Sequence, residues 1–264
     1  MSDTLAAPPE FHAHAAWRRI DFISDLHLSA DTPRTADAWA AYLRGTPADA
    51  VLILGDLFEV WVGDDARFEG FEADGAKVLQ EAAAQRHVAF MAGNRDFLVG
   101  DEMLRACRVH RLADPTLLVA FGQRVLLTHG DALCLDDVDY QKFRAMVRNP
   151  AWQAQFLAQP LAARRDYARE VRRQSEARKH ENATPAEWAD VDPPEALRWL
   201  REARSATLVH GHTHRPASQP IGDAGAQRHV LSDWEMDHPP HRAEVLSLSA
   251  AGFQRLSLAR ALAR

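Results

Sequence analysis

Cysteine is scarce in this chain, which has only Cys107 and Cys134 among its 264 residues. Two cysteines form neither a disulfide framework nor a thiolate metal cluster, and their scarcity indicates a reducing compartment. Long hydrophobic runs are also lacking, because no stretch approaches the roughly 18 apolar residues of a membrane-spanning helix. The segment 1–17 lacks the basic start and apolar run of a signal peptide. These features favour the cytoplasm, although a protein attached to a membrane surface would look the same.

An excess of positive charge is lacking too. The chain has 31 Lys and Arg against 37 Asp and Glu, for a net charge of −6, and this balance excludes a general nucleic-acid binder. Hydrophobic residues make up 47% and charged residues 26%, which excludes wholesale disorder because such a chain can bury a core. The length suits one large α/β domain, or a core domain with an inserted cap.

Short apolar runs alternate with helical stretches along most of the chain. Five runs predict strands buried on both faces: Ile20–Ser24, Ala50–Leu54, Val88–Ala92, Arg124–Thr128 and Thr207–His210. Between them, stretches such as Ala36–Arg44 and Gly75–Gln85 predict helices. This alternation is typical of a layered α/β sandwich.

The two ends of the chain differ from this pattern. Residues 1–17, with their Ala-Pro-Pro-Glu segment, are predicted to be a loose tail. Near the C-terminus, three runs predict consecutive strands of a meander: Gln227–Leu231, Ala243–Leu248 and Gly252–Leu256. We therefore expect the core to comprise residues 18–134 and 205–264.

Residues 135–204 interrupt the alternation and are predicted to be a helical insertion. Between residues 141 and 179 we count ten Lys and Arg against three Asp and Glu, which makes this segment strongly basic inside an acidic chain. A solvated helical hairpin would explain the charge. Apolar residues are interleaved, however, and basic plus apolar helices also describe a surface that meets anionic lipid or phosphate. These residues are Phe143, Met146, Val147, Trp152, Phe156 and Leu157.

Metal-ligand residue types gather where the predicted strands end. The five groups are Ser24-Asp25-Leu26-His27, Gly55-Asp56, Gly93-Asn94-Arg95-Asp96, Thr128-His129-Gly130-Asp131 and His210-Gly211-His212-Thr213-His214. On extended backbone, Asp25 and His27 would share one face, as would His212 and His214. Ligand sites of open α/β sheets lie at the carboxyl ends of strands, so we expect these groups to meet.

Seven oxygen and nitrogen ligands at these strand ends are too many for one tetrahedral site. They suffice for two ions if one carboxylate bridges them, and the lack of thiolates favours Mn²⁺, Fe or Zn²⁺. Two cations a few Å apart can clamp a phosphoryl group and generate a hydroxide nucleophile. A single Asp or His at a strand end is usually a helix cap or a satisfied polar residue, so the prediction depends on all five groups together. His210 should point away from His212 and lie in the core.

These five groups resemble the motifs of the calcineurin-like metallophosphoesterase superfamily. The resemblance implies a four-layer αββα sandwich around a dinuclear site, here with an inserted helical cap. It implies that Asp25, His27 and His214 hold one metal and that Asp56 bridges the two. The ligands it implies for the other metal are Asn94, His129 and His212.

The third group departs from the superfamily pattern, which usually has Gly-Asn-His where this chain has Gly93-Asn94-Arg95. Arg95 cannot donate a proton at working pH, but its guanidinium can bind phosphoryl oxygens. An alkoxide leaving group benefits greatly from protonation, whereas a phosphate group, with a pKa near roughly 6, benefits far less. Arginine at this position therefore suggests a phosphoanhydride substrate rather than a simple monoester.

Longer stretches resemble the UDP-2,3-diacylglucosamine hydrolase family of the lipid A pathway. They are residues 56–65, residues 93–100, residues 210–216 and the helical insertion at 135–204. The resemblance implies Mn²⁺-dependent hydrolysis, by a metal-bound hydroxide, of a pyrophosphate to 2,3-diacylglucosamine 1-phosphate and UMP. It also implies peripheral attachment at the cytoplasmic face of the bacterial inner membrane, two Mn²⁺ ions and a diacylated lipid substrate; we expect a monomer that binds no nucleic acid.

The resemblance carries over to substrate contacts unevenly. Asp56, Asn94 and Arg95 are implied to act in catalysis, and Asn94, Arg95 and His212 also to contact the substrate. Asp137 and Ser175 match family positions in the insertion. The family often has Asn and Lys after that serine, where this chain has Lys179 and Asn182, so Lys179 is expected to supply the positive charge.

Rival functions remain open at this point. Another phosphoesterase of the same fold, acting on a soluble nucleotide or a phosphoprotein, would not need an apolar cap. A non-catalytic scaffold usually loses metal ligands, whereas all seven are present here. A nucleic-acid-binding cap would need aromatic stacking platforms, for which Trp152 and Phe156 are candidates.

Overall fold

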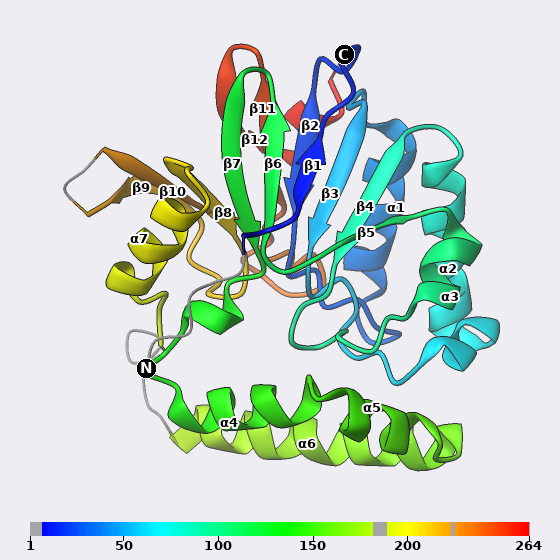
Figure 1. Ribbon diagram of the computed structural model, residues 1–264. Coiled ribbons are helices and arrows are strands. Elements are labelled where there is room, and N and C mark those ends of the chain that lie inside the picture. The colour runs from blue at the N-terminus through cyan, green and yellow to red at the C-terminus, as the bar shows by residue number, and fades with distance from the viewer. Residues whose placement is uncertain (1–6, 182–188, 223–224, 264) are drawn as a thin grey trace.

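The computed structural model describes residues 7–181, 189–222 and 225–263, with the side chains of residues 174–181 outside that description. The protein contains two six-stranded mixed sheets that face each other (Figure 1). No described helix has the length and apolar character needed to cross a membrane.

The first sheet has the order β12-β11-β2-β3-β4-β5. Strands β2 to β5 run parallel to one another, and β11 pairs antiparallel with both β2 and β12. Their bounds are β2 Ile20–Ile23, β3 Ala50–Leu54, β4 His87–Met91, β5 His110–Leu112, β11 Glu244–Ser249 and β12 Gly252–Ser257. Helices α1 (Pro33–Gly45), α2 (Gly70–Ala83) and α3 (Asp101–Cys107) cover its outer face.

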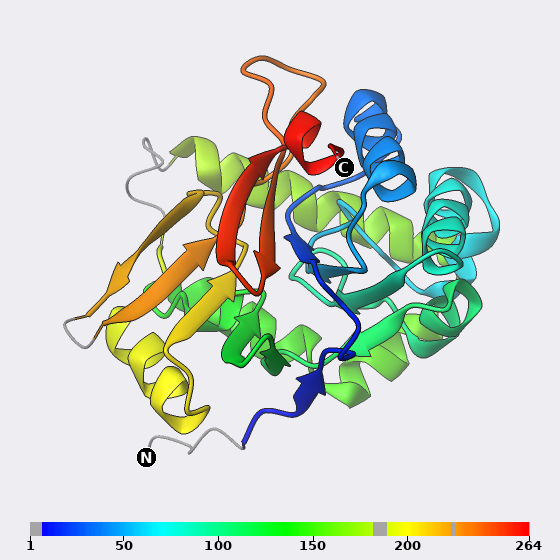
Figure 2. The ribbon, with the colours of Figure 1, turned by 90° about the horizontal axis from the view of Figure 1, so that it is seen from above.

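The second sheet has the order β1-β6-β7-β8-β10-β9. Strands β7, β8 and β10 run parallel, whereas β6 and β9 pair antiparallel with β7 and β10. The bounds are β1 Glu10–His12, β6 Thr116–Ala120, β7 Gln123–Thr128, β8 Thr207–His210, β9 Ala217–Ile221 and β10 Ala226–Val230. Helix α7 (Pro193–Glu202) covers its outer face, opposite α1–α3, as the view in Figure 2 shows.

Alternating side chains of the buried strands fill separate layers of core, as the two-residue period of a strand requires. In β3, Val51 and Ile53 face the cluster with α1–α3, while Leu52 and Leu54 face the cluster between the sheets. A third cluster joins the second sheet to α7 through residues such as Trp199. These layers confirm the predicted four-layer αββα sandwich.

The insertion forms helices α4 (Val138–Val147), α5 (Pro150–Leu157) and α6 (Leu161–Glu181), which lie together beneath the sheets (Figure 1). Asn149 caps α5 through its side chain, and Pro150 stands at the first helical position, where a missing N–H costs nothing. Helix α7 does not belong with them, because it packs on the second sheet. The cap of the structure therefore ends before α7 and is shorter than the predicted 135–204 segment. Short helices η1 (Asp64–Phe68), η2 (Asp131–Leu133) and α8 (Leu258–Ala261) complete the fold.

Two predictions for the ends of the chain are wrong. Residues Glu10–His12, expected in a loose tail, pair in parallel with β6, and Phe11 and Trp17 pack against the core between the sheets. The expected C-terminal meander does not form as one unit. Strands β11 and β12 are a hairpin of the first sheet, but β10 joins the second sheet beside β8. In both places, contacts distant in sequence decide the pairing.

Candidate dinuclear metal centre

The predicted ligands lie in the loops that directly follow β2, β3, β4, β7 and β8. Backbone hydrogen bonds hold these loops against one another. Asp25 N donates to Gly55 O (3.1 Å), His27 N to Asp56 O (3.0 Å) and Gly211 N to His129 O (2.9 Å). The chain therefore fixes the relative positions of the loops through its backbone before any side chain takes part.

The backbone of these loops is not extended. Asp25, His27, Asp56, His212 and His214 have φ values of +54°, +50°, +53°, +67° and +51°. Such left-handed conformations are uncommon for residues with a side chain and gather at functional sites. The expectation that each Asp-x-His or His-x-His pair shares a strand face is therefore wrong, although the side chains still converge.

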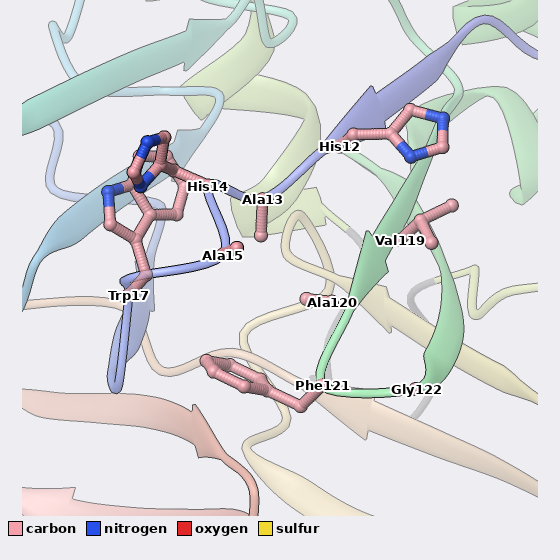
Figure 3. Close-up of a pocket in the computed structure, with 9 residues that line it drawn as sticks. All are labelled: His12, Ala13, His14, Ala15, Trp17, Val119, Ala120, Phe121 and Gly122. Atoms are coloured by element: carbon pink, nitrogen blue, oxygen red, sulfur yellow. The ribbon is translucent and has the colours of Figure 1, made fainter.

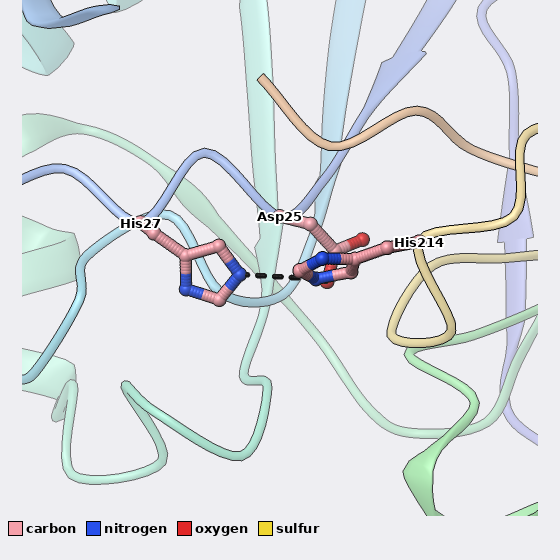
Figure 4. Close-up of side chains that lie close together, drawn as sticks. All are labelled: Asp25, His27 and His214. Carbon is pink, nitrogen blue, oxygen red and sulfur yellow. Dashed lines mark hydrogen bonds and ion pairs between the residues drawn. The ribbon is translucent and has the colours of Figure 1, made fainter. Parts of the chain in front are cut away.

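Asp25, His27 and His214 form the first group of potential ligands, and their ligand atoms lie within 4.8 Å of one another. His27 Nε2 is 3.2 Å from His214 Nε2, and His214 Nε2 is 3.5 Å from Asp25 Oδ1. Figure 4 shows both rings turned toward each other with the Asp25 carboxylate beside them. Two ring nitrogens and a carboxylate oxygen thus face one small volume.

The second group gathers around Asn94. Its Oδ1 lies 2.9 Å from His129 Nε2 and 2.9 Å from His212 Nδ1. His129 Nδ1 lies 2.9 Å from the Leu54 carbonyl, so Nδ1 carries the proton and donates it there. In the neutral ring this tautomer would present the Nε2 lone pair to a metal, the arrangement usual for ligating histidines.

Asp56 lies between the two groups. Its Oδ2 is 3.9 Å from His27 Nε2, in the first group, and its Oδ1 is 3.7 Å from His129 Nε2, in the second. Asp25, Asp56 and His129 also form a set whose ligand atoms lie within 4.8 Å of one another. One carboxylate with an oxygen toward each group has the geometry of a bridging ligand.

Glycines make room for these side chains. A Cβ at Gly93 would lie 2.1 Å from Asp56 Oδ1, and one at Gly211 would lie 2.3 Å from Asp25 Oδ2. Neither carboxylate could keep its place beside a larger residue. Oxygen and nitrogen donors without thiolates fit divalent cations of the Mn²⁺, Fe and Zn²⁺ kind, so the residues fit the dinuclear site that the fold implies.

The electrostatics of the site also favour bound cations. Burial alone would lower the pKa of His129, but Asp56, Asp131 and Asp25 raise it to about 9. Burial would raise the pKa of Asp25, yet His214 and its neighbours hold it well below its usual range. The buried carboxylates thus create a field that stabilises positive charge.

Residues without a predicted role hold the ligands in place. Asp96 is fully buried and accepts from Gly93 N (2.8 Å) and Leu57 N (2.8 Å), so it ties together the loops after β3 and β4. Ser24 Oγ donates to Asp25 Oδ2 (2.5 Å). Asp96 and Ser24 both belong to the five strand-end groups of the sequence. Their position next to the ligands is the only feature of the sequence that could have pointed to them.

Arg95 and Glu59 lie at the edge of the metal centre. The Arg95 N–H donates to Asp56 Oδ1 (2.8 Å), and its guanidinium Nη1 is 3.3 Å from Glu59 Oε1. Arg95 Nε is buried and has no hydrogen-bond partner among the described residues. Burial would raise the pKa of Glu59, but His27, Arg95 and Arg172 lower it to about 2. Sequence reasoning gave Glu59 no role, although it lies within the family-like segment 56–65.

Of the predicted substrate contacts in the insertion, Asp137 caps α4 by accepting from Tyr140 N (3.0 Å) and is exposed. Ser175 and Lys179 belong to α6, but their side chains lie outside the described residues, as does Asn182 entirely. His210 is fully buried and accepts from Arg228 Nε (2.8 Å), in agreement with a core position.

The cap contacts the metal centre from below through α4. Arg144 Nε and Tyr140 Oη donate to Asp131 Oδ2 at 2.9 and 2.5 Å. Arg148 donates to the carbonyl of Gly93, the residue before Asn94 (2.8 Å). These bonds place the first cap helix over the loops after β4 and β7.

A separate hollow of about 340 Å³ lies between the N-terminal segment and the β6–β7 hairpin (Figure 3). His12, His14, Trp17 and Phe121 are among its lining residues, and none of the predicted metal ligands is. The chemistry suggested by the sequence is therefore concentrated at the strand ends and not in this hollow.

Comparison with known proteins agrees with this geometry. Residues 18–216 match the family model described as calcineurin-like phosphoesterase. The chain is 43% identical over 250 residues to the UDP-2,3-diacylglucosamine hydrolase of Stenotrophomonas maltophilia, covering 90% of this chain and 98% of the relative. It is 49% identical over 220 residues to that of Chromobacterium violaceum, covering 81% and 90%. The chain belongs to the UDP-2,3-diacylglucosamine hydrolase family of calcineurin-like phosphoesterases.

Proposed function

We propose that this protein hydrolyses the pyrophosphate bond of UDP-2,3-diacylglucosamine to 2,3-diacylglucosamine 1-phosphate and UMP, a step of lipid A biosynthesis. The observation that carries the proposal is the convergence of two ligand groups on Asp56. It is found in a chain whose relatives are named UDP-2,3-diacylglucosamine hydrolase. The helical cap, which lies beneath the sheets in Figure 1 and contacts the loops after β4 and β7, supports a substrate that is larger than a nucleotide.

Two Mn²⁺ ions are the cofactors that we propose for the site. Asp25, His27 and His214 would hold one ion and Asp56 would bridge to the other, for which the remaining ligands are Asn94, His129 and His212. When bound, such a pair supplies Lewis acidity and neutralises charge on a phosphoryl group. The protein's own share is to hold the seven ligands in place through the loop-to-loop hydrogen bonds.

Arg95 is the group we propose for stabilising negative charge on the phosphoryl oxygens. Its buried Nε has no partner among the described residues, so it can donate to a substrate oxygen without breaking another bond. Guanidinium groups bind phosphate in a fixed planar geometry and do not lose their proton. Since the leaving group is a phosphate, Arg95 need not act as an acid.

Further substrate contacts belong to the same proposal. Asn94 and His212 would contact the phosphoryl oxygens. Asp137, Ser175 and Lys179 would bind the sugar or the phosphates from the cap. Lys179 takes the place of a lysine found three residues further along in the family pattern.

The acyl chains would lie against apolar side chains of the cap. Val138, Met146 and Leu157 are 57%, 43% and 41% exposed, although each is large and apolar. Burying a chain against such residues stabilises binding by about 0.8 kcal/mol per CH₂. We propose in addition that the monomeric enzyme attaches peripherally to the cytoplasmic face of the inner membrane, where a diacylated substrate would reside.

Turnover of the purified protein on UDP-2,3-diacylglucosamine, followed by release of UMP with and without Mn²⁺, tests the proposal. We expect Mn²⁺-dependent release of UMP and no comparable hydrolysis of UDP-N-acetylglucosamine, which lacks the acyl chains. Equal turnover of a soluble nucleotide or a phosphopeptide would instead assign the site to another phosphoesterase activity. Absence of UMP at saturating Mn²⁺ would contradict the proposal.

A further inference from the structure

Glu59 is a nearly buried carboxylate at the junction of the metal centre and the cap. It lies three residues after Asp56, and its side chain is only 11% exposed. Its backbone N–H donates to Leu28 O (3.0 Å), which fixes the loop after β3 against the loop after β2. A carboxylate in such a place needs several partners to offset the loss of water.

One oxygen of Glu59 faces the metal centre. Its Oε2 lies 3.1 Å from His27 Nδ1, while Nε2 of the same ring faces His214 and Asp56. With a proton on Nδ1, next to this carboxylate oxygen, the ring would keep the Nε2 lone pair for a cation. Carboxylates that hold ligating histidines in this way raise the basicity of the ligand and fix its orientation.

The other oxygen of Glu59 faces the substrate side and the cap. Its Oε1 lies 3.3 Å from Arg95 Nη1 and 3.3 Å from Nε of Arg172 on α6. Arg172 is separated from Glu59 by 113 positions in the chain, so this ion pair joins the cap to the core. One carboxylate therefore contacts both arginines and a proposed metal ligand.

We propose that Glu59 is a positioning residue that couples the docking of cap helix α6 to metal binding at His27. The inference rests on the proposed function, since it concerns the same dinuclear site. Arg172 and Arg95 hold the carboxylate beside Nδ1 of His27. Because coupling between two sites is reciprocal, a filled metal site favours the docked cap, and a docked cap favours the filled site.

Titration of Mn²⁺ into the metal-free full-length protein by calorimetry tests this proposal. Glu59→Gln keeps the shape but loses the charge, and we expect it to weaken Mn²⁺ binding about 10- to 100-fold, as loss of such a partner does. Arg172→Gln should weaken binding about fivefold, the lower end of coupling between sites. In the double variant, Arg172→Gln should have no further effect, because its influence passes through Glu59.

Asp139→Asn provides the matched control. Asp139 is an exposed residue of cap helix α4 that pairs with Lys142 of the same helix, so its replacement removes a carboxylate charge from the cap without loosening the contact between cap and core. We expect its Mn²⁺ affinity to match wild type. Wild-type affinity of Glu59→Gln, an equal loss in Asp139→Asn, or additive effects in the double variant would overturn the proposal.

Two features keep this test decisive. If Glu59→Gln does not fold, Arg172→Gln replaces it in the test, because the Arg172 side chain is 44% exposed and its substitution should not prevent folding. Wild-type Mn²⁺ affinity of Arg172→Gln then overturns the coupling. The titration contains no substrate. A failure to hydrolyse UDP-2,3-diacylglucosamine would therefore overturn the proposed function but not the coupling through Glu59. Unchanged Mn²⁺ affinity of the variants would overturn the coupling but not the proposed function.

Discussion

Asp56 is the residue on which the two ligand groups depend. It offers one oxygen to each group, its φ is +53°, and only a glycine at position 93 leaves room for its carboxylate. Backbone held in this region costs roughly 1–3 kcal/mol and persists only where the surroundings enforce it. The loop therefore keeps a strained conformation that presents the carboxylate between His27 and His129.

Removal of this carboxylate gives the first prediction. Asp56→Ala should abolish activity, by at least about 10³-fold, because the bridge contributes several kcal/mol of charge stabilisation through the metals. Elemental analysis should show that bound metal falls sharply. Asp37→Ala, on the exposed face of α1, is the matched control and should behave as wild type. An anomalous-scattering map with a single ion remote from Asp56 would reject the bridging role.

Arg95 gives the second prediction. Arg95→Ala should lower kcat/KM about 10²-fold or more, as loss of a transition-state donor does. The acid limb of the pH–rate profile should remain, since Arg95 holds charge and supplies no proton. Arg95→Lys should restore the rate only in part, because an ammonium lacks the planar pair of donors. A rate near wild type for Arg95→Ala would end the assignment.

Residue types and their order were enough to predict which side chains meet at the strand ends, but not how the backbone brings them together. The motifs name Asp25 and His27, whereas their left-handed backbone depends on hydrogen bonds to Gly55 and Asp56, residues from another loop. Glu59 could not be singled out, because its role depends on Arg172, which is distant in sequence. Supporting residues are defined by contacts that no local pattern contains.

At the scale of elements, Arg164 fastens α6 to the core. It is 2% exposed, donates to Gln159 O (2.9 Å) and to Val62 O, and pairs with Asp65. A Cβ at Gly63 would lie 2.2 Å from its Nη1, so the close approach requires glycine there. A buried cation with carbonyl and carboxylate partners anchors the cap more firmly than an exposed pair.

The neighbouring arginines provide the third prediction. Arg164→Ala should lower the free energy of unfolding by about 2 kcal/mol, because it removes hydrogen bonds to a charged group and leaves Val62 O without its donor. Arg165→Ala breaks surface pairs with Glu69 and Glu72 and should cost about 0–1 kcal/mol. Denaturant unfolding of the two variants checks this, and equal losses would contradict the anchoring role of Arg164.

The apolar residues of the cap divide into two classes that sequence could not separate. Phe156 and Val147 are 5% and 3% exposed, and Phe156 stacks on Trp152 with ring centroids 4.9 Å apart. Trp152 in turn lies 6.3 Å from Phe97, in the loop after β4. These residues pack helix against helix and cap against core. Met146 and Leu157 are exposed and remain available to acyl chains.

Kinetics separate the two classes and give the fourth prediction. Phe156→Ala should destabilise the protein by about 3–5 kcal/mol and impair hydrolysis of the lipid substrate and of a small chromogenic phosphodiester alike. Met146→Gln should raise KM for the diacylated substrate and leave kcat, the small diester and thermal stability unchanged, since loss of uniform binding affects KM alone. Equal damage to both substrates by Met146→Gln would contradict the acyl-binding role of the cap.

Most strands inside the two sheets were predictable, whereas three of the four edge strands, β1, β5 and β9, were not. The runs for β3 and β8 match the observed bounds residue for residue. Strands β1, β5, β6 and β9 went unpredicted, and β1 and β5 have only three residues each. Short edge strands are defined by their neighbours, as β1 is by β6. Helix α7 was assigned to the cap because its packing on the second sheet is not encoded locally.

At the scale of the whole molecule, the basic cap meets an acidic core. The chain carries a net charge of −6, yet residues 141–179 contain ten basic and three acidic residues. Several cap arginines form ion pairs with core carboxylates, for example Arg144 with Asp131, Arg164 with Asp65 and Arg165 with Glu69. Part of the positive charge of the cap therefore holds the cap against the core. The outward-facing basic residues are those that could bind an anionic surface.

Arg169 and Arg173 on α6 face outward, 71% and 72% exposed, and among the described residues they pair with Asp166 and Glu170 of the same helix. If the cap meets an anionic membrane, the protein should sediment with phosphatidylglycerol vesicles at low salt and release at high salt, because the attraction is screened within about 10 Å at 0.1 M. Arg169→Glu with Arg173→Glu should abolish this binding, since each basic residue contributes about 1 kcal/mol. Arg18→Glu with Arg260→Glu changes the charge equally, but these exposed residues lie outside the cap. That variant should bind as wild type, and equal loss in both variants, or no binding at low salt, would refute attachment through the cap.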